Sequence, residues 1–446
     1  MGKKSNRLSW IRYARLTAAG IFLILTGLAF SGIGRAVAPF LHLQFGPALM
    51  KCSAAFSAGS LTIVLGIVCF TLLFGRFYCS FFCPFGLLQD IIIALSVRRK
   101  TVSVPNFSTV RYAVAGVVCG LLFLGWSGGF LLLDPYSNFG RIFAAFSIGG
   151  LIPLLVIIAL AVWKKRIYCT TVCPVGTLLG LAAKFCLFKL TIKGKCVKCQ
   201  TCVKFCPAGC IDLENGRIDN ERCIRCMNCI SRCPLGSIGF DLREKTEMKP
   251  DVSRRAFLIN GGVLIAGLAA GALLAKTGLG KLAEYAKRFK ILPPGAGNAE
   301  RFAAKCTACQ LCTANCPAGI IIPAPGGDGP VSLDLGRGAC QYDCNRCSQV
   351  CPTGAIVPLT LERKRKTKIA EAKFDPRKCI VFQEGKKCGK CASACPVKAV
   401  RLRRTGAPFP VKASLCIGCG ACQAVCPAPE KAIAVHEIDK QTVIEA

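Results

Sequence analysis

The sequence predicts a membrane α-helical bundle that carries small α+β, cysteine-rich domains on both sides of the membrane. Three observations lead to this fold class. Hydrophobic residues make up 53% of the 446 residues and charged residues only 18%, which is too apolar for an ordinary soluble protein. Long apolar stretches interrupt the chain, and 33 cysteines recur in regular spacings, mostly outside them. This composition excludes a disordered or collagen-like chain and argues against a small disulfide scaffold.

Four apolar stretches in the first third of the chain are each close to the ~20 residues that cross a bilayer as a helix. They are Leu16–Gly34, Ala54–Phe74, Val110–Leu133 and Ile142–Trp163. Basic residues crowd the start of the first stretch and the ends of the second and fourth, whereas the opposite connections hold few. The positive-inside rule therefore places both ends of this domain, residues 1–190, in the cytoplasm.

A repeated motif divides the four spans into two duplicated hairpins. Residues 76–86 match residues 166–176, and each copy contains Cys-x3-Cys-Pro after a span that returns to the cytoplasm. The motif supplies two possible redox pairs, Cys79 with Cys83 and Cys169 with Cys173. Either the four thiols converge on a pseudo-twofold axis and hold a shared metal or iron–sulfur centre, or each pair remains free thiols or a labile disulfide that shapes its loop.

Two runs of Cys-x2-Cys-x2-Cys-x3-Cys-Pro follow, with the spacing by which bacterial-type ferredoxins hold [4Fe–4S] cubes. They are Cys196, Cys199, Cys202 and Cys206, then Cys223, Cys226, Cys229 and Cys233. Three thiolates at this spacing wrap three corners of one cube, and the cysteine before proline reaches the neighbouring cube. The sequence therefore predicts a cytoplasmic two-cluster domain over residues 191–245, in which Cys233 completes the first cube and Cys206 the second.

Four further sets occupy residues 301–446. They are Cys306, Cys309, Cys312 and Cys316; Cys340, Cys344, Cys347 and Cys351; Cys379, Cys388, Cys391 and Cys395; and Cys416, Cys419, Cys422 and Cys426. The middle two have longer first gaps, which we expect to loop out without loss of the ligand. We expect one [4Fe–4S] cluster per set, six in all, with neighbouring sets exchanging their fourth cysteines. Zinc rarely uses this spacing, and structural disulfides are also disfavoured.

Five cysteines remain outside these motifs: Cys52, Cys69, Cys119, Cys186 and Cys210. Most of them lie in or beside apolar segments, so we expect them to be small buried side chains.

A fifth apolar stretch, Ala256–Ala275, follows the segment Ser253–Leu258 with its paired arginines. This pattern is typical of a twin-arginine export signal; the alternative is a plain membrane helix. A domain that carries clusters must cross the membrane already folded, as such a signal implies. We expect residues 250–276 to be retained as a fifth span rather than cleaved after Ala275. Residues 277–300 then form a linker to a periplasmic four-cluster domain.

Charge and missing motifs limit the chemistry. The formal net charge of +35 falls to about +23 once six cubes of about −2 each are counted. This balance suits the lipid bilayer or an acidic redox partner, and no nucleic-acid motif is present. The chain has only two histidines and no Cys-x-x-Cys-His, dinucleotide or Walker motif, so we expect no haem and no NAD. His42 is a weak candidate for a quinone contact, and Asp90 and Asp134 for taking protons.

The order of these features resembles a known arrangement. Residues 1–245, with the Cys79/Cys83 and Cys169/Cys173 motifs, resemble the NapH-type membrane ferredoxin. Residues from 250 onward, with Ser253–Leu258 and four cluster motifs, resemble the NapG-type (MauM-type) exported ferredoxin. In that family the two are usually separate chains that act as a quinol dehydrogenase beside the periplasmic nitrate reductase. Here they are fused, which leaves the terminal acceptor open.

These observations predict a multi-pass iron–sulfur protein of the bacterial cytoplasmic (inner) membrane. It would oxidise quinol from the membrane quinone pool and pass electrons through [4Fe–4S] clusters to a periplasmic redox partner, a reductase or cytochrome. About 30 Å of hydrocarbon separates the two sides, so either the quinone carries electrons across or the shared cysteine centre shortens the path. The alternative function is an assembly or regulatory factor that supplies electrons for maturing a partner metalloenzyme.

Overall fold

The computed structural model describes residues 9–31, 35–54, 58–96, 107–124, 126–143, 148–193, 196–242, 250–277, 290–323, 330–403, 406 and 408–444. They divide into two compact units. The first comprises residues 1–28 and 39–280, and the second residues 29–38 and 281–446.

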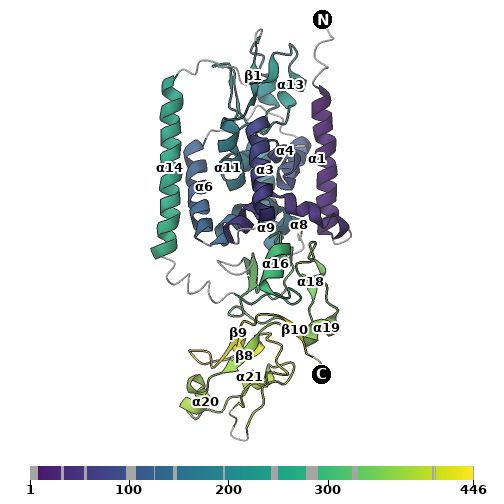
Figure 1. Cartoon of the computed structure of the whole chain (residues 1–446), viewed down its shortest axis with the longest axis vertical. Helices are drawn as coiled ribbons and strands as arrows, with labels where there is room; N and C mark the ends of the chain where they lie inside the picture. The colour runs from purple at the N-terminus through teal and green to yellow at the C-terminus, as the bar shows by residue number, and fades with distance from the viewer. Residues whose placement is uncertain are drawn as a thin grey trace. The chain divides into compact units, whose positions relative to one another are not determined.

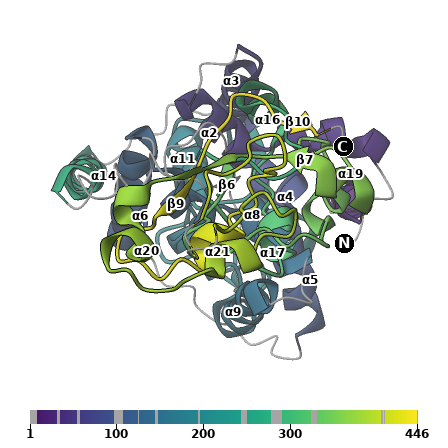
Figure 2. The same ribbon diagram turned by 90° about the horizontal axis from the view of Figure 1, so that it is seen from below.

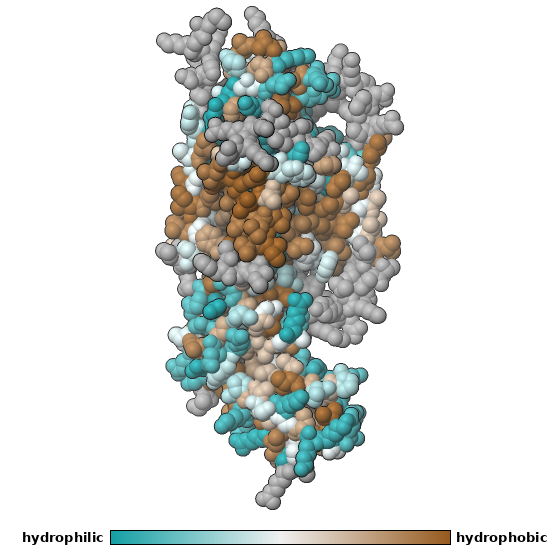
Figure 3. Space-filling model, turned by 180° about the vertical axis from the view of Figure 1, so that it is seen from behind, coloured by the Kyte–Doolittle hydropathy of each residue, from teal (hydrophilic) through white to brown (hydrophobic). Residues whose placement is uncertain are grey.

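A helical bundle makes up most of the first unit (Figure 1). Its longer helices are α1 (Ser9–Phe30), α3 (Ala58–Phe74), α6 (Ser108–Phe123), α9 (Ile148–Lys164) and α14 (Pro250–Thr277). Its shorter ones are η1 (Arg35–Leu43), α2 (Phe45–Ala54), α4 (Tyr78–Phe81), α5 (Pro84–Leu95), α7 (Ser127–Leu133), α8 (Pro135–Phe143), α10 (Ile167–Thr171) and α11 (Pro174–Lys184). Large apolar side chains are exposed along α1, α3 and α9, for example Ile24, Leu65 and Leu155. Figure 3, which is seen from the side opposite to Figure 1, shows apolar residues gathered in a band across the helical bundle.

The helices are shorter than hydropathy predicts. Among the described residues, one helix, Trp10–Phe30, is long and apolar enough to cross a membrane by length and composition, and the other apolar helices have 10–17 residues. The stretch predicted as a span over Val110–Leu133 is broken between α6 and α7, where Trp126 N donates to Leu121 O at 2.9 Å. Hydropathy does not register this break, because the Ser and Gly residues that follow Trp126 are nearly neutral on such scales.

Helices α6 and α14 lie side by side at the edge of the bundle (Figure 2). Their contact is made by glycines spaced four apart, Gly116 and Gly120 on α6 and Gly267 and Gly271 on α14. A Cβ atom on Gly116 would lie 2.6 Å from the carbonyl oxygen of Leu264. This close backbone approach is the packing that Gly-x3-Gly helix pairs use in membranes. The side chains of residues 251–257, which include the paired arginines, lie outside the described residues.

A small lobe follows the bundle in the first unit. It contains β1 (Phe188–Ile192), α12 (Thr201–Lys204), β2 (Ile211–Asp212), β3 (Arg217–Ile218), α13 (Asn228–Arg232) and β4 (Ile238–Leu242). β1 pairs antiparallel with β4, with Phe188 opposite Leu242, and β2 pairs with β3. The lobe packs directly on the bundle, where Phe188 stacks on Phe74 with ring centroids 5.3 Å apart.

The second unit has short elements around several cysteine loops. They are α16 (Ala299–Lys305), α17 (Leu311–Ala314), β5 (Ile321–Pro323), β6 (Val331–Leu333), α18 (Arg346–Gln349), α19 (Leu361–Lys366), β7 (Thr367–Lys368), β8 (Glu371–Phe374), η2 (Pro376–Lys378), α20 (Ile380–Gln383), α21 (Lys390–Ser393), α22 (Ala421–Ala424), β9 (Ile433–His436) and β10 (Thr442–Val443). The antiparallel pairs are β5 with β6, β7 with β10 and β8 with β9.

Residues 290–297, which the sequence assigns to a linker, pack into the core of the second unit. Ile291, Leu292 and Ala296 are buried. The backbone is also engaged, because Leu333 N donates to Ile291 O at 2.8 Å and Gly295 N donates to the side chain of Gln441 at 2.9 Å. The Pro-Pro-Gly sequence therefore makes a packed turn.

The glycine contact of α14 can be tested by adding a single methyl group. Gly271→Ala would place its Cβ 2.6 Å from the carbonyl oxygen of Val117, and such overpacking costs about 1–3 kcal/mol. We expect a lower melting temperature of the purified protein in detergent. Gly262→Ala, on the same helix with no atom within 4 Å, is the control and should be neutral or slightly stabilising. Equal melting temperatures would contradict the close packing.

Candidate iron–sulfur sites

Four of the cysteine loops share one backbone conformation. Each loop carries the first three cysteines of its set. The residues directly before and after the middle one of these three have a left-handed backbone: Lys198 and Gln200, Arg225 and Met227, Ala308 and Gln310, Gly418 and Gly420. Such a conformation costs a non-glycine residue roughly 1–2 kcal/mol. A short helix follows each loop, α12, α13, α17 or α22, and carries the third cysteine. The loop curls so that its three thiols line one cavity.

The two sets with longer first gaps fold differently. Asn345, after the middle cysteine of its set, has a φ of −128°, and Gly389, after Cys388, has a φ of −161°. The long gap after Cys379 is occupied by the short helix α20. Cys379 nevertheless lines the same cavity as Cys388 and Cys391.

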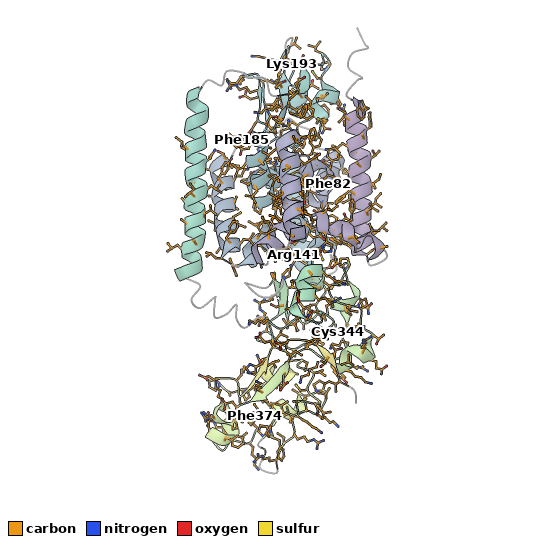
Figure 4. All side chains as sticks on the ribbon, in the orientation of Figure 1. Phe82, Arg141, Phe185, Lys193, Cys344 and Phe374 are labelled. Carbon is orange, nitrogen blue, oxygen red and sulfur yellow. The ribbon has the colours of Figure 1, made fainter. Side chains whose placement is uncertain are left out.

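The structure gathers the 24 cysteines of these motifs into six groups. In chain order they are site 1 (Cys196, Cys199, Cys202, Cys233), site 2 (Cys206, Cys223, Cys226, Cys229), site 3 (Cys306, Cys309, Cys312, Cys351), site 4 (Cys316, Cys340, Cys344, Cys347), site 5 (Cys379, Cys388, Cys391, Cys426) and site 6 (Cys395, Cys416, Cys419, Cys422). In each pair of neighbouring sets, the cysteine before proline lies with three cysteines of the other set. Figure 4 labels Cys344, a member of site 4 in the second unit.

The surroundings of the thiols fit a [4Fe–4S] cluster. Apart from sulfur, the lining is mainly apolar; in site 1 it includes Ile192, Val197 and Ile238. Backbone N–H groups point at sulfur, for example from Ser237 to Cys233 Sγ at 3.3 Å. Such donors stabilise the thiolates that hold a cluster.

Burial disfavours bare thiolates at several of these cysteines, whereas hydrogen bonds with Cys210 lower the pKa of Cys206 and of Cys223 in site 2. Burial and then neighbouring cysteines raise the pKa of Cys226 in site 2 to about 12, and likewise the pKa of Cys422 in site 6 to about 12. Four thiols thus ionise together only when a positively charged centre lies between them.

Two observations concern the spacing and the state of the cysteines. Within the described ranges, no three His, Cys, Asp or Glu side chains are close enough to hold one metal ion. The side chains are therefore too far apart for one tetrahedral zinc ion, whose Zn–S bonds are about 2.3 Å long. The cysteines of the described residues are free thiols, and the exclusion of structural disulfides stays a prediction.

The four cysteines of the repeated motif form a separate cluster, which we call the quartet: Cys79, Cys83, Cys169 and Cys173. All four are buried and lie close enough together that ionisation of one thiol would disfavour ionisation of the others. In each copy the second cysteine caps a helix that begins at proline. Cys83 Sγ accepts from Gly86 N at 3.4 Å, and Cys173 Sγ accepts from Gly176 N at 3.2 Å. The Cys-Pro pair is therefore a helix start, with proline at the first helical position.

Two fully buried arginines join the copies reciprocally. Arg76 Nη2 donates to Cys169 O at 3.2 Å, and Arg166 Nη1 donates to Cys79 O at 2.9 Å. Both guanidinium groups have no exposed surface. Four buried thiols beside the guanidinium of Arg76, which donates toward Cys79 Sγ at 3.7 Å, are a donor set that fits an iron–sulfur cluster.

The other polar candidates have structural contacts. Asp90 pairs with Arg166 at 2.7 Å and with Arg15 at 3.4 Å. Asp134 is buried and accepts from the backbone and hydroxyl of Ser137 at 2.8 and 3.0 Å. These contacts give Asp90 a structural role, whereas Oδ1 of Asp134 is buried without a hydrogen-bond partner among the described residues, so proton uptake at these carboxylates stays a prediction. His42 lies in η1 with its ring 3.5 Å from Lys51 Nζ, and burial, then the Lys51 charge, lower the pKa of His42.

The five remaining cysteines are not uniformly small buried side chains. Cys69 is exposed, and Cys186 accepts from Arg225 Nη2 at 3.1 Å. Cys210 lies inside site 2, with its sulfur 3.5 Å from Cys206 Sγ. Sequence reasoning missed this position, although its distance of four residues after the Cys-Pro cysteine was a usable signal.

The lobe is held on the bundle through the segments that carry site 2. Arg76 Nη1 donates to Glu221 O at 3.2 Å, two residues before Cys223, and the Glu221 carboxylate pairs with Arg111 at 3.1 Å. Arg166 N donates to Pro207 O at 3.2 Å, directly after Cys206. Both arginines of the quartet therefore contact the site 2 backbone.

Six cysteine groups of this kind define an iron–sulfur protein of the ferredoxin type. The family described as 4Fe–4S binding domain matches residues 56–103 and 146–193, the two copies of the repeat. Families described as 4Fe–4S dicluster domain match residues 189–241, 305–356, 339–399 and 385–430.

Curated relatives carry related names. The ferredoxin-type protein NapF of Escherichia coli K12 is 30% identical over 140 residues, which cover 31% of this chain and 80% of NapF. The methylamine utilization ferredoxin-type protein MauN of Paracoccus denitrificans is 30% identical over 176 residues, 38% of this chain and 60% of MauN. The putative electron transport protein YccM of Escherichia coli K12 is 24% identical over 215 residues, 45% of this chain and 59% of YccM.

The chain belongs to the family of ferredoxin-type 4Fe–4S electron-transfer proteins. It spans about three fifths of the length of the first curated relatives that it matches. No solved structure is significantly similar to it.

The exchange of fourth cysteines can be tested by thiol labelling. In the iron-loaded protein, Cys351→Ala should make Cys306, Cys309 and Cys312 reactive, because these four line site 3. Cys316→Ala, the matched variant, should instead release Cys340, Cys344 and Cys347 of site 4. Anaerobic alkylation followed by mass spectrometry identifies the labelled residues. The opposite pattern would show that each set keeps its own fourth cysteine.

Proposed function

We propose that this protein is a membrane-bound quinol dehydrogenase subunit. It takes electrons from quinol in the bacterial cytoplasmic membrane and passes them through [4Fe–4S] clusters to a periplasmic reductase or cytochrome. The observation that carries this proposal is the continuous set of contacts from the buried quartet, within the apolar bundle, to site 2 of the lobe.

Six clusters, one at each of sites 1–6, supply the electron carriers. Quinol gives up two electrons and two protons, whereas a cube accepts one electron without a proton. Clusters held by the cysteines of these sites would therefore supply one-electron carriers that separate the electron pair. The similarity to the putative electron transport protein YccM supports this general role.

The quartet is proposed to hold a seventh centre, shared by the two copies of the repeat. Arg76 contacts both the quartet and the lobe that carries site 2, since it donates to Cys169 O and to Glu221 O. A centre at the quartet would lie between site 2 and the hydrocarbon region. This position supports the path in which the shared cysteine centre shortens electron transfer across ~30 Å of hydrocarbon, rather than the path in which the quinone carries the electrons across.

A five-span bundle is the proposed membrane anchor. Helices α3, α6 and α9 have 16–17 residues, which is near the lower limit of about 17 for a span and is tolerated by local thinning of the bilayer. The exposed apolar side chains of α1, α3 and α9 support lipid contact. The glycine packing of α14 on α6 supports its retention as an anchor after twin-arginine export.

The domain order supports the NapH-like and NapG-like fusion as the specific assignment. Residues 191–245 would then face the cytoplasm and residues 301–446 the periplasm, as the charge pattern of the sequence indicates.

Reduction in liposomes tests this function. The wild-type protein, in vesicles that contain a quinol, should lose its visible iron–sulfur absorbance. Cys79→Ser with Cys169→Ser should lose about four irons per chain and bleach more slowly, because the first acceptor is removed. Cys69→Ser, at an exposed cysteine of α3, is the control and should behave as wild type.

Each part of the proposal has its own negative result in this experiment. Clusters that stay oxidised with every quinol would reject quinol oxidation. An unchanged iron content in the double variant would reject the seventh centre. A deletion strain whose partner enzyme lacks its metal, rather than its electron supply, would favour the assembly function.

A further inference from the structure

Site 2 contains five thiols, one more than a cube requires. Cys210 is buried and lines the same cavity as Cys206, Cys223, Cys226 and Cys229. Its sulfur lies 3.5 Å from Cys206 Sγ, and it also hydrogen-bonds with Cys223. The thiol therefore stands beside two of the four sulfurs that would hold the cluster.

The surrounding backbone holds Cys210 in this position. The chain turns at Gly209, which has a φ of +58°, and Cys210 O accepts from Asp219 N at 2.8 Å just before strand β2 begins. The segment from Cys206 to Cys210 thus forms a short loop with a sulfur at each end, and both sulfurs face the same cavity.

The fifth thiol is specific to site 2. The residue four positions after the Cys-Pro cysteine is not a cysteine at the other five sites. Those residues are Ser237, Ile320, Ala355, Ala399 and Glu430. Ser237 and Ala399 use this position to donate a backbone N–H to the preceding cysteine sulfur, at 3.3 and 3.2 Å.

We propose that Cys210 is a reserve ligand for the cluster of site 2. Its sulfur binds the iron atom that Cys206 otherwise holds, whenever Cys206 is not bound to that atom. In this exchange the Fe–S bond to Cys206 breaks and the bond to Cys210 forms. The Cys210 thiol gives up its proton and the Cys206 thiolate takes one, so the iron keeps its charge and no electron is consumed. The short separation of the two sulfurs lets the exchange occur with small movements of the loop.

The location of this reserve ligand matters for electron flow, a point that rests on the proposed function. Site 2 is the ferredoxin site whose backbone contacts the arginines of the quartet. Loss of its cluster would separate the quartet from site 1. A second ligand keeps the cluster in place at this junction.

Iron counting on the full chain tests the reserve ligand. Cys206→Ala, purified without oxygen, should keep its full iron content, because Cys210 replaces the lost sulfur. Cys206→Ala with Cys210→Ala should lose about four irons per chain. Cys233→Ala, the matched change at site 1, should also lose about four, because Ser237 stands where Cys210 stands in site 2.

A transplanted thiol gives the reciprocal test. Cys233→Ala with Ser237→Cys should regain the iron that Cys233→Ala loses. In the Cys206→Ala protein, the electron paramagnetic resonance signal of the reduced site 2 cluster should shift, since its ligand geometry has changed.

The outcomes separate this inference from the proposed function. If Cys206→Ala loses as much iron as the double variant while the other sites remain loaded, Cys210 is not a reserve ligand. The remaining iron also shows that the variant has folded. A wild-type protein without iron would instead overturn the iron–sulfur function itself.

Discussion

Two buried positive charges hold the first unit together. Arg76 and Arg166 have no exposed surface, and a buried guanidinium is tolerated only where its donors find acceptors and its charge is balanced. Their partners come from three parts of the unit: the opposite copy of the repeat, the carboxylate of Asp90 and the backbone of the lobe. The duplicated helices, the quartet and the docked lobe are therefore fixed by one set of contacts. Arg166 is paired with Asp90, whereas the partners of Arg76 are carbonyl oxygens and a sulfur, so the charge of Arg76 makes the interior suitable for an anionic cluster.

In the second unit, sulfur takes the place of much of the apolar core. The strands have two to four residues, and small domains bury a lower fraction of their surface than large ones, which makes their stability marginal. Cys312, Cys347 and Cys351 lie within the same buried cluster as Phe302 and Ile320. A bound iron–sulfur cube would join these residues as the centre of the core. Stability and electron transfer then depend on the same groups.

The sequence anticipates local features well, because a cubane motif spans only a few turns of the chain. The grouping of Cys196, Cys199 and Cys202 follows from their spacing. The reciprocal contacts of Arg76 and Arg166 join segments about 90 residues apart, and no local pattern reveals them. Hydropathy also missed the break after Phe123. The buried turn at residues 290–297 escaped prediction because proline and glycine are as common in packed turns as in linkers.

The left-handed residues beside the middle cysteines have a consequence for the life of the protein in the cell. In three of the four loops these residues are not glycine, as at Lys198 and Gln200, so each bare loop carries roughly 2–4 kcal/mol of conformational strain. Without metal, such loops relax toward open conformations that proteases cleave readily. We therefore expect newly made chains that lack iron to be degraded before loaded ones, so that proteolysis enriches the loaded form.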